Sequence, residues 1–366
     1  MRAYAILMML QGHFIYTLLA DEYRDTASAW YNSWAFMRGM TAPIFFFASG
    51  LIFVFLLLKD QRPFPENQRV KKGLRRAAQL ILIGYLLRLC FPQLLLGHFS
   101  PDLLSVDVLH CIGLALLSVI GLFGLSHYTR LPFPLLLLAG AGMAFFFYFD
   151  ITNADWSLLP LALENYLTRA NGSAFTPVPW VGYTLLGGVL GYTLHHRPQW
   201  AFGYGLPAAL LIFGLLAHAY SSDWLMDLYR WTGVEQFKQH AYFNFLLKRL
   251  GHVFVVTALF VWLAQLWRAV PRLLLRVGSE TLIIYEVHYI LLYSSWFGIG
   301  LSRFWAHALS PVVAVAGALV FVASFILMVA YIDPIRAFAK AKQERILRLA
   351  RLWFYRRRRA WAIHAK

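Results

Sequence analysis

Ten long apolar runs constrain this chain more than any other feature of its sequence. A helix that crosses a membrane needs about 20 mostly apolar residues, because the hydrocarbon core of a bilayer is about 30 Å thick. Of all residues, 60% are apolar and 14% are charged, against about 25% charged in soluble domains, which argues against a soluble enzyme. The runs are continuous and do not alternate, so helices are expected in place of strands. The sequence therefore predicts an all-α polytopic membrane protein with about ten transmembrane helices, at residues 3–20, 41–58, 78–97, 108–126, 131–149, 179–195, 201–219, 250–270, 279–298 and 311–332.

Lysine and arginine are divided unequally between the two sides of this arrangement. The loop 59–77 carries seven of them and the segment after Asp333 carries eleven. With ten spans, both segments lie on one side, which then holds 24 basic residues against eight on the other. Basic residues are retained on the cytosolic side of membrane proteins. We therefore expect both termini to be cytosolic, with a membrane domain over 1–332 and a basic tail over 333–366.

This distribution also explains the net charge of +16. A band of positive charge on the cytosolic side of a membrane protein usually faces anionic lipid headgroups. Anionic lipids are therefore the expected partner of the tail, and nucleic acid is not. Ile346, Leu349 and Trp353 recur between basic residues of the tail. This spacing suits a helix that lies on the membrane surface.

Ionisable groups inside spans are costly and are candidates for function. In the first run, Arg2 and His13 are 11 residues apart, so they share a helix face and differ in height by about 16 Å. One face would then carry a cation at the cytosolic mouth and an imidazole deep in the membrane, which suits a long anionic cofactor with its reactive group at the far end. The alternative is a snorkelling arginine and a hydrogen-bonded packing histidine.

Further polar residues fall within the third and ninth runs. Arg88 lies near the centre of the third run, and Glu286 is the mid-span carboxylate available to pair with it. In the ninth run Thr281, Tyr285 and His288 form one polar stripe, and Glu286 points elsewhere. Either His288 lines a cavity and Glu286 holds Arg88, or the reverse.

Asp107 and His110 stand at the start of the fourth run. Asp107 either caps that helix or orients His110. The chain has no zinc motif and no serine nucleophile elbow, so no metal is expected.

Several patches resemble the transmembrane acyltransferase superfamily, in that family's order along the chain. They are Arg2 with its spacing to His13, residues 41–50, the sequence DVLHCIG at 107–113, PWVG at 179–182 with LGG at 186–188, and GSETLIIYEVH at 278–288. The chain is most similar to bacterial proteins like heparan-α-glucosaminide N-acetyltransferase, which are related to the acyltransferase-3 family. Two positions depart from the pattern. The family's Asp three residues before the arginine would fall ahead of Met1, so either the start is misassigned or the chain does without this Asp, and Ala3 stands where Gly is frequent.

The resemblance implies a transmembrane acyltransferase domain over 1–332 that moves an acyl group, acetyl first, from cytosolic acyl-CoA to an acceptor on the outer side. The expected acceptor is a glycan or glycolipid hydroxyl or amine, the expected location is the bacterial inner membrane, and a homodimer is left open. His13 is then the catalytic base or acyl carrier, with His288 as the second candidate. Expected contacts to CoA are Arg2, Lys72, Arg75 and Arg76, and expected supporting residues are Arg88, Glu286, Asp107 and His110. The alternative function is a transporter or flippase for a lipid-linked glycan.

Overall fold

The computed structural model describes residues 1–98, 101–267, 269–344 and 348. Helices make up 77% of the structure, and the described residues form no strand. The all-α prediction is therefore confirmed. Most of the basic tail, including Ile346, Leu349 and Trp353, lies outside the described residues, so the surface helix stays a prediction.

Each predicted apolar run coincides, wholly or in part, with one of the longer helices. These are α1 (Arg2–Leu18), α3 (Thr41–Leu57), α4 (Gln68–Leu86), α6 (Val108–Thr129), α7 (Phe133–Phe146), α10 (Pro177–His196), α11 (Gly205–Thr232), α13 (Phe245–Leu266), α15 (Thr281–Tyr293) and α17 (Pro311–Ala330). The short helices between them are α2 (Ala29–Gly39), α5 (Phe91–Leu95), α8 (Tyr148–Asn153), α9 (Leu161–Glu164), α12 (Glu235–Tyr242), α14 (Arg272–Ser279) and α16 (Leu301–Trp305).

By length and composition, five described segments could cross a membrane by themselves. They are Ala29–Leu57, Asp102–Thr129, Gly205–Thr232, Phe245–Leu266 and Pro311–Ala330, and two shorter apolar helices are Phe133–Phe146 and Thr281–Tyr293. The chain is thus an integral membrane protein. The count of ten spans and the side of each terminus stay predictions.

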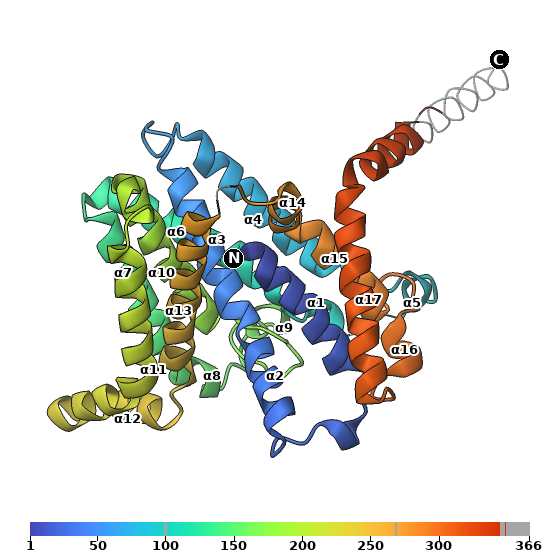
Figure 1. The fold of residues 1–366 in the computed structure, drawn as a ribbon, viewed down its shortest axis with the longest axis horizontal. Coiled ribbons are helices and arrows are strands. Elements are labelled where there is room, and N and C mark those ends of the chain that lie inside the picture. The colour runs from blue at the N-terminus through green and yellow to red at the C-terminus, as the bar shows by residue number, and fades with distance from the viewer. Residues whose placement is uncertain (99–100, 268, 345–347, 349–366) are drawn as a thin grey trace.

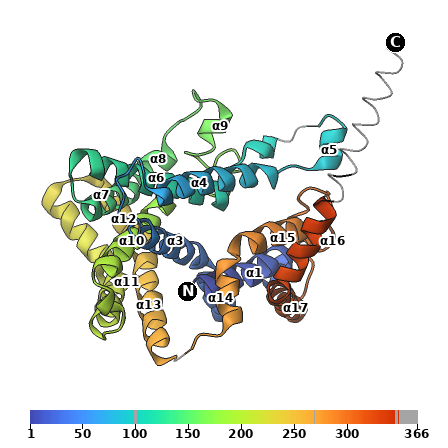
Figure 2. The same cartoon turned by 90° about the horizontal axis from the view of Figure 1, so that it is seen from above.

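The long helices form two groups that meet around α3 (Figure 1). In one group α10 packs against α3, α7 and α6, and α11 packs against α13. In the other, α1 packs against α17, α14 and α15. Seen from above, α4 and α6 lie on the opposite side of α3 from α1, α14 and α15 (Figure 2). The loop before α4 and the end of α17 share the upper edge of Figure 1, and α2, α8 and α12 share the lower edge.

Glycines let α3 and α10 approach to backbone contact. A Cβ built on Gly50 would lie 1.8 Å from the carbonyl oxygen of Thr184, and one built on Gly187 would lie 1.9 Å from that of Phe47. Gly191 continues the row four residues later, where a built Cβ would lie 2.3 Å from the carbonyl oxygen of Leu51. Small residues at this spacing are the usual means of close helix packing in membranes. These backbone contacts, which we call the glycine seam, therefore hold α10, and with it the side chain of Trp180, against α3.

The third run differs from its prediction. The helix begins at Gln68 and ends at Leu86. It begins there because the Asn67 side chain caps it by accepting hydrogen bonds from the N–H groups of Arg69 (2.8 Å) and Val70 (3.1 Å). Its first half is amphipathic, which a count of apolar residues does not detect. The basic residues predicted in the loop 59–77 therefore lie mostly on the helix. Arg88 lies in the turn after it, so the prediction that Arg88 is near the centre of a span is wrong.

Candidate active site

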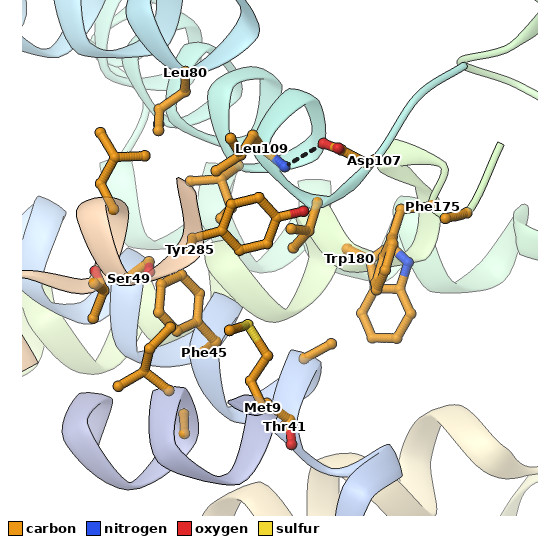
Figure 3. A pocket seen from close by; sticks show the side chains of 18 of the residues that line it. Met9, Thr41, Phe45, Ser49, Leu80, Asp107, Leu109, Phe175, Trp180 and Tyr285 are labelled. Atoms are coloured by element: carbon orange, nitrogen blue, oxygen red, sulfur yellow. Dashed lines mark hydrogen bonds between the residues drawn. The ribbon is translucent and has the colours of Figure 1, made fainter. Parts of the chain in front are cut away.

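One cavity of about 830 Å³ runs between the two helix groups. It is lined along α1 from Arg2 to His13, a rise of about 16 Å, and we name its two ends after these residues. Between the ends the lining is mainly apolar and comes from α1, α3, α4, α6 and α15; the residues labelled there in Figure 3 are Met9, Phe45, Ser49, Leu80 and Tyr285. The predicted shared face of Arg2 and His13 is thus the wall of a real cavity.

At the Arg2 end, two predicted CoA contacts line the cavity. Arg2 donates a hydrogen bond of 2.6 Å from Nη2 to Oγ1 of Thr281, and its guanidinium lies 5.7 Å from the ring centre of Phe45. Arg76 lines the same end. No carboxylate of the described residues forms an ion pair with either arginine. Both cations are therefore available to an anionic ligand.

The other two predicted CoA contacts, Lys72 and Arg75, are exposed on α4 and do not line the cavity. Their role in CoA binding stays a prediction that the geometry does not favour.

At the other end, the structure brings His13 and His288 together. Nδ1 of His13 lies 3.1 Å from Nε2 of His288, within hydrogen-bond distance. His13 lines the cavity, whereas His288 is fully buried behind it and does not. Thr281, Tyr285 and His288 do share the buried face of α15, as the stripe predicted. His13 is therefore the imidazole that a ligand can reach, and His288 is its hydrogen-bonded partner.

Three further arginines of the cavity lining were counted in the sequence only as evidence for topology. Arg38, at the end of α2, lies against α1 at Gly12, where a Cβ would come within 2.7 Å of its Cγ. Its guanidinium lies 3.9 Å from the ring centre of Tyr16, three residues after His13 on α1. Arg169 and Arg249 line the same cavity. They lie outside the predicted spans or at a span's edge, so only the tertiary fold reveals them as site residues.

Asp107 combines both roles that the sequence left open. Its Oδ1 accepts a hydrogen bond from the N–H of Leu109 (2.9 Å; Figure 3) and lies 3.1 Å from Nδ1 of His110. It therefore caps α6 and holds His110. His110 is fully buried and packs where a Cβ on Gly84 would come within 2.5 Å of its ring. Its place is structural, and Asp107 alone of the two lines the cavity.

Arg88 pairs with Asp107 and not with Glu286. Arg88 Nε lies 3.9 Å from Oδ2 of Asp107, and the Arg88 side chain is 14% exposed. Within the described chain no ion pair joins Arg88 to Glu286. Glu286 is half-buried and lies outside the cavity lining, and the charge of Arg76 acts on its carboxyl group. The expected Arg88–Glu286 pair is wrong, because Arg88 sits in a turn beside the start of α6. His288 and Glu286 therefore match neither of the two predicted alternatives.

Comparison with known proteins gives one match. The family model described as heparan-alpha-glucosaminide N-acetyltransferase, catalytic, matches residues 1–225. This region contains α1 to α10 and contributes most of the cavity wall, although His288 and Arg249 lie beyond it. No curated protein and no solved structure matches the chain. Because this match covers more than half of the chain, the chain belongs to the heparan-alpha-glucosaminide N-acetyltransferase catalytic family.

Proposed function

We propose that the protein transfers an acyl group, acetyl first, from acyl-CoA on the cytosolic side to a glycan or glycolipid amine or hydroxyl on the opposite side of a bacterial inner membrane. The observation that carries the proposal is the single cavity with free arginines at one end and His13 at the other. Family membership supports acyl transfer as the reaction class.

The Arg2 end suits the phosphates of CoA. Guanidinium groups bind phosphate through paired charged hydrogen bonds, and Arg2 and Arg76 have no carboxylate partner to displace. The apolar middle of the cavity then takes the pantetheine arm. In this pose the thioester lies near His13, about 16 Å along α1 from Arg2.

The paired imidazoles suit general base catalysis. In the tautomer in which Nδ1–H of His13 donates to Nε2 of His288, the lone pair of His13 Nε2 is free. That nitrogen takes the proton from the acceptor amine or hydroxyl as its nitrogen or oxygen attacks the thioester carbon. The carbon–sulfur bond then breaks, and the leaving thiolate takes the same proton from the imidazolium. His288 holds the ring orientation throughout.

The test is acetyl-CoA turnover by the full chain in lipid nanodiscs, followed by release of free CoA with and without a mixture of amino sugars and cell-envelope glycolipids. We expect CoA to bind, slow release without acceptor and faster release with it. A chain that binds no CoA, yet moves labelled lipid-linked glycan between leaflets, would show that the protein is a flippase.

A further inference from the structure

The charge of the cavity wall is unbalanced. Six arginines line it, and Asp107 is the one carboxylate among its lining residues. The proposed CoA site uses the two arginines at the Arg2 end. Of the other four, Arg38 lies against Gly12, next to His13 on α1, and Arg249 reaches Gly39, next to Arg38. Arg88 and Arg169 complete the set of lining arginines.

Of these four, Arg88 alone has a carboxylate nearby. Its partner is Asp107, at 3.9 Å. Within the described part of the chain, no ion pair involves Arg38, Arg169 or Arg249. Among the described residues, these three guanidiniums therefore have no ion-pair partner.

Two of the three are held in place without using their hydrogen-bond donors. The Arg38 guanidinium rests on the rings of Tyr16 and Trp34, at 3.9 and 5.6 Å from their centres, and its buried Nε has no hydrogen-bond partner. Arg249 lies over the ring of Phe245 at 5.3 Å, and its Nη2 comes within 3.4 Å of a Cβ built on Gly39, next to Arg38. Aromatic faces fix a guanidinium and leave its N–H groups to a ligand.

We infer that the His13 end binds a phosphate ester carried by the acyl acceptor, through Arg38, Arg169 and Arg249. This inference rests on the proposed function, since it places the acceptor at His13. The three arginines come from α2, the loop after α9 and α13. Guanidiniums that arrive from three elements suit the several oxygens of a tetrahedral phosphate. A phosphate monoester carries about −1.5 to −2 near neutral pH, so it balances three free cations better than a sulfate or a carboxylate.

The experiment measures binding of glucose 6-phosphate, glucose 6-sulfate, glucuronate and glucose to the full chain in neutral phosphatidylcholine nanodiscs, by calorimetry. Saturating CoA is present to fill the Arg2 end. We expect glucose 6-phosphate to bind at least tenfold more tightly than glucose. Arg38→Gln and Arg169→Gln should each weaken glucose 6-phosphate binding about tenfold, and Arg38→Lys should restore part of the affinity.

Arg230→Gln is the matched control, because Arg230 is exposed, pairs with Asp227 at 2.9 Å and does not line the cavity. It should leave glucose 6-phosphate affinity unchanged. Unchanged CoA affinity shows that each variant is folded. Equal affinity for the phosphate, sulfate, carboxylate and neutral sugars, or equal effects of Arg38→Gln and Arg230→Gln, would overturn the inference.

A second arm identifies the source of the phosphate. If nanodiscs that contain phosphatidic acid abolish sugar phosphate binding, the ester belongs to a lipid headgroup, and if binding persists, it belongs to a glycan. If wild-type protein binds glucose 6-phosphate but not CoA, the proposed acyl transfer fails while the phosphate site stands.

Discussion

At the scale of single residues, the pairing of two imidazoles decides what His13 can do. His288 lies within hydrogen-bond distance of Nδ1 of His13 on the buried side. The other ring nitrogen of His13, Nε2, is therefore the one that can contact a ligand in the cavity. The spacing of Arg2 and His13 predicted that they share one face of α1, and both line one cavity. The stripe on α15 was predicted as well, but its position beside His13 was not. Arg38, Arg169 and Arg249 could not be predicted, because nothing in their local sequence distinguishes them from other basic residues between spans.

His13→Asn tests the base directly. Asparagine keeps a hydrogen-bonding side chain of similar size but has no basic nitrogen, and loss of a general base typically costs 10²–10⁴-fold in rate. We expect acyl transfer to fall by that factor, with CoA binding and thermal stability retained. The measurement is transfer from radiolabelled acetyl-CoA. A near wild-type rate would make His13 a packing residue.

Arg2→Gln and Arg76→Gln test the CoA site. A hydrogen bond to a charged group contributes about 1.5–3 kcal/mol, so each substitution should weaken CoA binding by roughly tenfold or more. Lys72→Gln and Arg75→Gln remove the same charge from α4 outside the cavity and serve as matched controls. Equal losses for all four in a CoA titration would mean that the charge of α4, and not the cavity, attracts CoA.

At the scale of elements, backbone contact and amphipathic patterning decide where helices lie and where they begin. Hydropathy predicted where most helices occur but misplaced α4, because its first half presents exposed cations. The buried row of α4, which runs along the whole helix, is Val70, Gly73, Ala77, Leu80 and Gly84. Helix α11 likewise continues through residues 220–232, which the sequence placed in an outward loop. The glycine seam between α3 and α10 is a tertiary feature, and a single sequence does not show which glycines face a backbone.

Gly187→Val should destabilise the protein strongly. Its side chain would have to enter space filled by the Phe47 carbonyl, and overpacking of a tight interface typically costs about 1–3 kcal/mol. Gly142→Ala is the control, because a Cβ at Gly142 meets nothing within 4 Å and alanine favours a helix over glycine. Thermal unfolding in detergent should show a lower melting temperature for Gly187→Val alone; equal effects would argue against the seam.

At the scale of the whole molecule, the segments that lie at its two edges agree with one orientation in the membrane. The loop before α4 and the end of α17 lie at one edge, and α2, α8 and α12 lie at the other (Figure 1). The 24-to-8 division of basic residues predicts that the first edge faces the cytosol. What a sequence cannot supply is the cavity between the helix groups, since its walls come from segments hundreds of residues apart.

Single-cysteine labelling tests this orientation. In a background with Cys90 and Cys111 replaced by serine, cysteine at Asp155 should react with a membrane-impermeant maleimide added to spheroplasts. Cysteine at Arg62 should react only after the membrane is permeabilised. The opposite pattern would reverse the orientation, and with it the side from which CoA enters.

The cavity along α1 also bears on how the cell keeps its ion gradients. A cavity that carries charged groups on its wall inside a membrane domain is a potential passage for protons and sodium. Six fixed guanidiniums in that passage create a positive electrostatic barrier, as charged rings do in selective channels. Arginines that attract the proposed anionic reactants would therefore also repel small cations, which would limit ion leakage through the cavity.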